Sequence, residues 1–136
     1  MTGDDGGTIP FQDRTVRADI LIVDDEADVR RSMSEVLQIS GFSVVEAEDG
    51  AVAYGLLREN RYGMVLLDIR MPKLDGVSLI EALSELPPVV VHSAFSLSSE
   101  DRARLGTKVV QYLHKPVTPR ELLGTVKRVL AGGSDT

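Results

Sequence analysis

The sequence contains no cysteine among its 136 residues. A disulfide framework and a thiolate metal site are therefore both excluded, and the absence fits a reducing compartment. No apolar run approaches the roughly 20 residues that a membrane-spanning helix needs. Residues 1–18 are polar and lack the apolar stretch of a signal peptide. We therefore expect a cytoplasmic chain with no membrane insertion.

Positive charge is also scarce, because 15 lysines and arginines face 21 aspartates and glutamates, for a net charge of −6. Contact with nucleic-acid phosphates needs a basic surface, so we expect no direct binding to DNA or RNA. The length suits one domain with a core of its own. We divide the chain into a flexible polar tail over residues 1–18, one domain over 19–131, and a C-terminal tail or linker start over 132–136.

The sequence contains a set of short apolar runs, and each run is followed by a side chain that can act in catalysis or binding. Such runs are typical of buried strands. In a parallel sheet with helical crossovers, the carboxyl ends of the strands share one edge, where ligands bind. We therefore expect three carboxylates, a hydroxyl and an ammonium in one shallow pocket. The runs and their followers are Ile20–Val23 with Asp24 and Asp25, Met64–Leu67 with Asp68, Val89–Val91 with Ser93, and Val109–Leu113 with Lys115.

Amphipathic segments between the runs predict helices. Strand and helix alternate five times, which favours a flavodoxin-like (βα)5 doubly wound parallel α/β sheet of strand order 2-1-3-4-5. Apolar spacing and capping residues mark the elements. We expect a first strand at Asp19–Asp24, a helix at Ala27–Ile39, an edge strand at Ser43–Ala47, a helix capped by Asp49, a helix with Leu79, Ile80 and Leu83 inward, a short helix from Ser98, and a helix opened by Thr118 and Glu121.

The chemistry of the expected pocket follows from its residue types. Three carboxylates at close range repel one another, and a hard divalent cation relieves that repulsion. Mg²⁺ takes oxygen ligands in octahedral geometry and keeps several waters. The remaining lysine and hydroxyl suit a phosphoryl group. The residues therefore indicate Mg²⁺-assisted phosphoryl transfer to an aspartate, which would give a covalent aspartyl-phosphate.

From about Asp19 to Ala131 the chain resembles the receiver domains of two-component response regulators. Four segments carry the resemblance, each after its own strand: Val23–Glu26, Leu67–Gly76, Ser93–Ala94 and Tyr112–Pro116. It implies a phosphorelay switch, not a turnover enzyme, phosphorylated by a sensor histidine kinase or a histidine phosphotransfer protein. The signal would leave through the fourth helix, fifth strand and fifth helix. A downstream protein, a missing output domain, or a homodimer formed on phosphorylation would read it.

The resemblance also assigns the acceptor and the metal ligands. Asp68 is the nucleophile that receives the phosphoryl group and contributes to the Mg²⁺ site. Asp25 ligates the metal directly, while Asp24 acts largely through a water. The backbone carbonyl of Arg70 is the third protein ligand that the resemblance implies.

Further residues are implied to bind the phosphoryl group and to transmit the change. Lys115 contacts Asp68 and then a phosphoryl oxygen, and its bond to Pro116 is cis in the family. Ser93 donates a hydrogen bond to the phosphoryl group and moves toward it. Tyr112 is the switch aromatic on the fifth strand.

Two residues are expected to control phosphate loss. Arg70 and Phe95 flank the approach of water to the phosphoryl group, and neither can activate a water, so we expect slow hydrolysis. His92 and His114 each precede a site residue by one. Strand alternation therefore points them away from the side chains of Ser93 and Lys115.

Two other classes of function compete with this one. A small phosphatase or phosphotransferase would use Asp68 on a diffusing substrate, but it would usually need a lid and a nearby general acid. Asp68 is followed by Ile69 and Arg70, and the chain has no spare length for a lid. An inert interaction module of the same fold would have lost acidic or lysine residues that are all present. Steady release of inorganic phosphate from varied monoesters would favour the enzyme, whereas one phosphate retained per chain would favour the switch.

Overall fold

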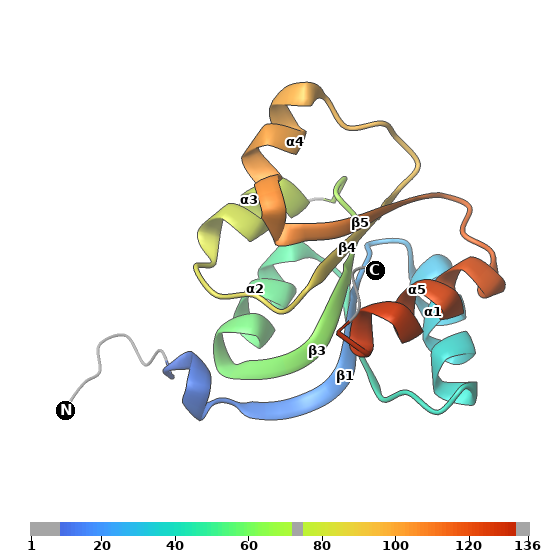
Figure 1. Ribbon diagram of the computed structural model, residues 1–136, viewed down its shortest axis with the longest axis horizontal. Helices are drawn as coiled ribbons and strands as arrows, with labels where there is room; N and C mark the ends of the chain where they lie inside the picture. The colour runs from blue at the N-terminus through green and yellow to red at the C-terminus, as the bar shows by residue number, and fades with distance from the viewer. Residues whose placement is uncertain (1–8, 72–74, 133–136) are drawn as a thin grey trace.

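The apolar runs form the centre of a parallel sheet. The structure, a computed structural model, describes residues 9–71 and 75–132. Its five strands lie in the order β2-β1-β3-β4-β5, and every neighbouring pair is parallel, which confirms the predicted fold (Figure 1). The strands are β1 (Thr15–Val23), β2 (Val44–Ala47), β3 (Asn60–Leu67), β4 (Val89–Ser93) and β5 (Val109–His114).

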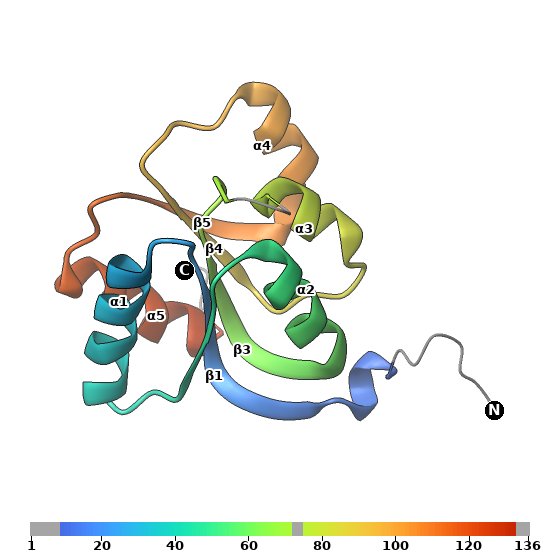
Figure 2. The same cartoon turned by 180° about the vertical axis from the view of Figure 1, so that it is seen from behind.

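Helices cover both faces of this sheet (Figures 1 and 2). Helices α1 and α5 lie on one face, and α2 and α3 lie on the other, with α4 beyond α3 near β5. The helices are α1 (Ala27–Ile39), α2 (Gly50–Glu59), α3 (Gly76–Ala82), α4 (Ser99–Leu105) and α5 (Pro119–Leu130); short 3-10 turns span Phe11–Asp13 and Gly106–Lys108.

The central strands are apolar throughout because both of their sides are covered. In β1, Leu21 and Val23 join the cluster packed under α2 and α3, whereas Ile20 and Ile22 join the cluster under α1 and α5. All four side chains are fully buried. Continuous apolar runs of this kind belong to parallel strands with helices on both faces.

The predicted helix starts are confirmed by their caps. Asp49 Oδ1 accepts a hydrogen bond from the Val52 N–H at 2.9 Å. Ser98 caps α4 through the Asp101 N–H, and Thr118 and Glu121 form a reciprocal capping box at α5. These bonds satisfy N–H groups that a helix leaves unpaired at its first turn. No helix in the described residues is long and apolar enough to cross a membrane.

The first strand begins earlier than predicted. We expected it at Asp19, but β1 starts at Thr15, and its first residues pair with β3 from Asn60 onward. Residues 15–18 therefore belong to the sheet and not to a tail. The pattern missed them because three of these four residues are exposed and backbone pairing holds the stretch. Of the rest of the predicted tails, residues 9–14 and 132 are described and include the 3-10 turn at Phe11–Asp13. Residues 1–8 and 133–136, like the loop residues 72–74, lie outside the described residues.

Candidate functional site

Four adjacent strands deliver the predicted side chains to one edge of the sheet. Asp24 follows β1, Asp68 follows β3, Ser93 ends β4 and Lys115 follows β5. Ladder hydrogen bonds continue into these residues, since the Asp68 N–H donates to the Val23 carbonyl and the Lys115 N–H to the Ser93 carbonyl, each at 2.9 Å. The site is therefore built on the rigid part of the fold.

Three aspartates form a group that could hold a metal ion. Asp24, Asp25 and Asp68 each offer an oxygen within 4.8 Å of the others. Asp24 is fully buried and Asp68 is 5% exposed, whereas Asp25 faces solvent. A set of hard oxygen donors at this spacing suits Mg²⁺ or Ca²⁺ better than a softer metal.

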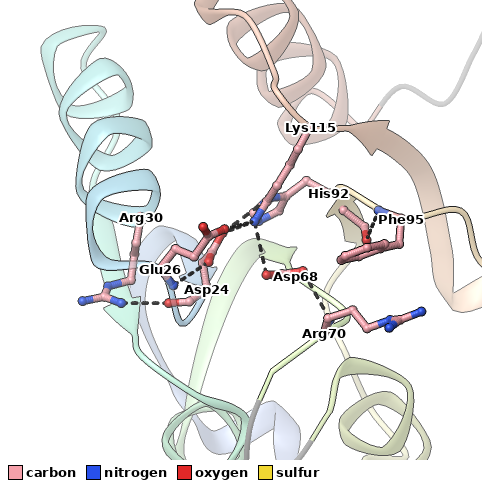
Figure 3. Close-up of polar contacts among 9 residues, drawn as sticks. Asp24, Glu26, Arg30, Asp68, Arg70, His92, Phe95 and Lys115 are labelled. Atoms are coloured by element: carbon pink, nitrogen blue, oxygen red, sulfur yellow. Dashed lines mark hydrogen bonds and ion pairs between the residues drawn. The ribbon is translucent and has the colours of Figure 1, made fainter.

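Lys115 connects the aspartates (Figure 3). Its Nζ donates to Asp24 Oδ2 at 2.9 Å, to Glu26 Oε1 at 3.1 Å and to Asp68 Oδ2 at 3.2 Å. Burial alone would lower the pKa of Lys115, but the hydrogen bonds to Asp24 and Glu26 and the nearby carboxylates raise it above its ordinary value. The side chain is therefore an ammonium that offsets part of the negative charge. The sequence analysis gave Glu26 no role, although it directly follows the aspartate pair.

Asp68 sits in a closely packed turn. Burial raises its pKa, and Lys115 opposes that rise. Its Oδ1 accepts the Arg70 N–H at 3.3 Å. The turn closes against the start of α3, where the Gly76 N–H donates to the Ile69 carbonyl at 2.9 Å. A Cβ at Gly76 would lie 2.8 Å from Ile69 Cδ1 and 3.0 Å from the Asp68 carbonyl oxygen, so only glycine allows this approach.

Ser93 and Phe95 lie beside Asp68 on the same edge. Ser93 is buried, and its Oγ accepts the Phe95 N–H at 3.1 Å. The Phe95 ring is 56% exposed, and the Arg70 guanidinium lies 4.6 Å from its centroid. The two residues predicted to flank the site are thus stacked on each other. That distance lies within the range of a cation–π contact.

Tyr112 is held by a second arginine. The Arg102 guanidinium of α4 lies 4.1 Å from the centroid of the Tyr112 ring. Tyr112 lines a small cavity together with Ser93 and Phe95. The predicted switch aromatic is therefore near the site and in contact with α4. Its movement, like the role of Ser93, stays a prediction.

The two histidines differ sharply. His114 is exposed, and its Nδ1 lies 2.7 Å from the Lys115 carbonyl oxygen. His92 is fully buried, and its Nδ1 lies 3.8 Å from Asp24 Oδ2. Burial, reinforced by the positive charge of Lys115, lowers the pKa of His92 to about 3, so the ring is neutral and the pair is not an ion pair. Alternation along β4 could not reveal this approach, because Asp24 belongs to another strand.

A groove opens next to the site between α1 and the β5–α5 connection. Its volume is about 580 Å³. The Lys115–Pro116 peptide bond, which borders this groove, is cis, as the resemblance implied. The lining residues are Glu26, Asp28, Val29, Ser32, Met33, His92, Ala94, Lys115, Pro116 and Val117.

Comparison with known proteins agrees with this geometry. Residues 20–127 match the family model described as the response regulator receiver domain. The transcriptional regulatory protein PrrA of Mycobacterium tuberculosis is 43% identical over 114 residues, which cover 82% of this chain and 49% of PrrA. The chain therefore spans about half the length of the curated relatives it matches.

Solved structures show the same likeness. A CheY-like response regulator receiver domain from Methanospirillum hungatei superposes with a TM-score of 0.77 at 25% identity, covering 87% of this chain and 96% of that one. The receiver domain of the Francisella response regulator 1452 gives a TM-score of 0.76 at 27% identity, covering 85% and 98%.

Proposed function

The chain belongs to the response regulator receiver domains of two-component systems, and on that premise we propose that it is a switch phosphorylated on Asp68. Receiver domains are generally switches and not turnover enzymes. The single observation that carries the assignment of Asp68 is its position: it lies with Asp24 and Asp25 and accepts a hydrogen bond from the ammonium of Lys115.

The phosphodonor is a phosphohistidine on a sensor histidine kinase or a histidine phosphotransfer protein. An Asp68 carboxylate oxygen attacks phosphorus, the P–N bond breaks, and its electron pair leaves on the imidazole nitrogen, which takes up a proton. Lys115 Nζ, 3.2 Å from Asp68 Oδ2, stabilises the charge that develops on the phosphoryl oxygens. The groove beside the site, lined by α1 and the β5–α5 connection, supports docking of the donor protein there.

Mg²⁺ is the cofactor that we assign to the site. Asp25 would bind it directly, Asp24 through a water, and Asp68 and the Arg70 carbonyl would complete the protein ligands. When bound, Mg²⁺ supplies positive charge that offsets the carboxylates and the incoming phosphoryl group. The donor set fits this role because all three carboxylates offer an oxygen within 4.8 Å of one another.

The output passes through α4, β5 and α5. Ser93 donates to the phosphoryl group and Tyr112 repositions, which changes the surface that a partner reads. The curated relative PrrA is a transcriptional regulatory protein, and the match covers 49% of its length. The reader is therefore a downstream protein, an output domain on the same polypeptide, or a second copy bound after phosphorylation. We place the chain in the cytoplasm, where the phosphodonor domains of such systems act.

A direct labelling experiment tests the acceptor. With acetyl phosphate and Mg²⁺, the intact mass should rise by one phosphoryl group per chain. Asp68→Asn should abolish the rise, and Glu85→Gln, an exposed acid outside the aspartate group, should not. Labelling that persists in Asp68→Asn contradicts the assignment. Steady release of phosphate from varied monoesters would instead favour a phosphatase. The residue two after Asp68 is Arg70, so that position offers no general acid for such an enzyme.

A further inference from the structure

His92 is a buried polar side chain that packing does not explain. Its ring is fully buried, and neither ring nitrogen has a hydrogen-bond partner among residues 9–71 and 75–132. A neutral imidazole carries one donor and one acceptor, and leaving both unpaired in a protein interior destabilises the fold. Val90, two residues earlier on the same strand, fills an equally buried place with an apolar side chain. An unpaired buried group of this kind calls for a specific reason.

The surroundings of His92 suggest that reason. Its Nδ1 lies 3.8 Å from Asp24 Oδ2, the oxygen that accepts Lys115 Nζ at 2.9 Å. The other oxygen of Asp24 is already engaged, since Oδ1 accepts the Glu26 N–H at 2.8 Å. Figure 3 shows His92 and Lys115 converging on Asp24, while the same ammonium also reaches Asp68. Asp24 and Asp68 therefore share one donor, the ammonium of Lys115, and His92 lies beside the Asp24 oxygen that accepts from it.

We propose that His92 is a positioning residue for Asp24. When Lys115 turns from Asp24 toward a phosphoryl group on Asp68, the His92 Nδ1–H moves onto Asp24 Oδ2 and replaces the hydrogen bond that Lys115 gives up. The ring has to close only from 3.8 Å to a hydrogen-bond distance of about 2.9 Å. This inference rests on the proposed phosphorylation of Asp68.

The replacement matters because Asp24 is fully buried. A buried carboxylate oxygen that loses its protein donor is costly even beside a metal-bound water, so a second protein donor favours the release of Lys115. A neutral imidazole supplies a donor without adding a second positive charge next to the cation site. It therefore releases Lys115 for the phosphoryl group while Asp24 keeps its orientation.

Nitrogen NMR of the whole chain tests the step directly. Protein labelled with ¹⁵N-histidine has two imidazole spin systems, since the chain has two histidines, and His92→Asn assigns them. With Mg²⁺ and beryllofluoride as the phosphoryl mimic, His92 should be the Nδ1–H tautomer, and its Nδ1 proton should move downfield. An unmoved His92 signal, or an Nε2–H tautomer in the mimic-bound form, overturns the proposal.

Two variants separate this role from simple packing. His92→Asn places an amide N–H near the Nδ1 position, and His92→Leu fills the space without a donor. His92→Leu should weaken binding of beryllofluoride in the presence of Mg²⁺ about tenfold, the effect of one hydrogen bond to a charged group. His92→Asn should stay within about threefold of wild type. Mg²⁺ binding alone should be nearly unchanged in both, because Lys115 then still holds Asp24.

The outcomes distinguish this inference from the proposed function. If acetyl phosphate does not label Asp68 in the wild type, the proposed function fails. Asp68 can be labelled while the role of His92 is refuted. That is the case if His92→Leu and His92→Asn both bind the mimic as tightly as wild type, or if both variants weaken binding of the mimic to the same extent. The NMR result on wild-type protein decides the question even if His92→Leu does not fold.

Discussion

At the scale of single residues, the site depends on how three carboxylates share one ammonium. Lys115 donates to Asp24, Glu26 and Asp68, and Asp24 has both of its oxygens engaged by protein donors. Asp25 is exposed. A metal ion can therefore use the carboxylate of Asp25 without displacing Lys115.

This difference predicts unequal effects on metal binding. Asp25→Ala should weaken Mg²⁺ binding by about tenfold or more, the order expected for a lost group in a metal site. Asp24→Ala should cost less if, as proposed, Asp24 contacts the metal through a water. A fluorescence titration with a reporter dye on the adjoining loop measures both affinities. Equal losses, or a larger loss in Asp24→Ala, would contradict the division of roles.

A second prediction concerns the stack of Arg70 on Phe95. The stack stands beside Asp68, and neither side chain can orient or activate a water. The double variant Arg70→Asn/Phe95→Glu should therefore lose its phosphate roughly tenfold faster, because it gains groups that can position water. The measurement is the decay rate of phosphorylated protein with Mg²⁺.

The chain offers a matched control for that comparison. Arg102→Asn removes another arginine–aromatic contact, the one on Tyr112, and should leave the decay rate near that of wild type. If the double variant decays no faster than wild type, the path of the water lies elsewhere.

The sequence predicted the convergence of Asp24, Asp68, Ser93 and Lys115 because it follows from one rule, that parallel strands end at one edge. It did not predict that Glu26 would share Lys115, or that His92 would approach Asp24. Those contacts depend on side-chain direction between different strands, for which a periodic pattern along one strand carries no information.

At the scale of elements, α4 differs from α5 in how it is attached. Within α4 only Leu105 is buried, and the other apolar residue, Ala103, is exposed. Helix α5 instead buries Leu122, Thr125, Val126 and Val129. An element with few buried apolar contacts opens at lower free energy than the rest of the fold.

We therefore predict faster hydrogen exchange in α4. Amides of Glu100–Leu105 should be at least about tenfold less protected than those of Leu122–Leu130. Beryllofluoride with Mg²⁺ should change the exchange of α4, since its Arg102 contacts Tyr112, the proposed switch residue. Equal protection of both helices that does not respond to the mimic would remove α4 from the switch.

A fourth prediction concerns the ion pair that ties α4 to α3. Arg104 Nε donates to Glu81 Oε2 at 3.0 Å, and this hydrogen bond lowers the pKa of Glu81 from its ordinary 4.5. A carboxyl group whose pKa is lowered on folding stabilises the fold at any pH above its pKa in the unfolded state. That stabilisation is lost as the pH falls through the pKa of the folded state. The tie should hold near neutral pH and weaken below about pH 4.5.

Carboxyl ¹³C NMR can check this tie. The Glu81 titration should lie below 4.5 in wild type and move upward in Arg104→Gln. Glu81 is the bidentate partner of Arg104, whereas Asp101 lies 3.4 Å from Arg104 Nη1 alone. A Glu81 titration that Arg104→Gln leaves unmoved would contradict the tie.

At the scale of the whole molecule, the two ends of the sheet have different roles. The carboxyl ends of its strands carry the site, and the opposite end holds the start of β1. There, Thr15–Ala18 pair with Asn60–Tyr62 of β3. Arg14 Nη1 donates to the Leu57 carbonyl at 2.9 Å. The sequence suggested a domain that begins at residue 19, because hydrophobic patterning cannot detect an exposed strand that backbone pairing holds.

The last prediction follows from that end of the sheet. A chain that begins at residue 19 should be less stable than one that begins at residue 9 by about 2 kcal/mol, since it loses several ladder hydrogen bonds worth roughly 1 kcal/mol each. The melting temperature should fall by roughly 5–10 °C. Phe11→Ala, which removes only the ring that Arg14 and Arg61 approach at 5.3 and 4.8 Å, should cost about 1 kcal/mol.

Phosphorylation should survive this truncation, because Asp68 lies at the opposite end of β3 from Asn60. Thermal unfolding of the two chains, followed by labelling with acetyl phosphate, measures both properties on the same samples. Equal melting temperatures would mean that residues 9–18 add nothing to the fold and that the domain does begin at residue 19. A lower melting temperature with Asp68 still labelled would make the first half of β1 a support for the sheet, separate from the site that the sheet carries.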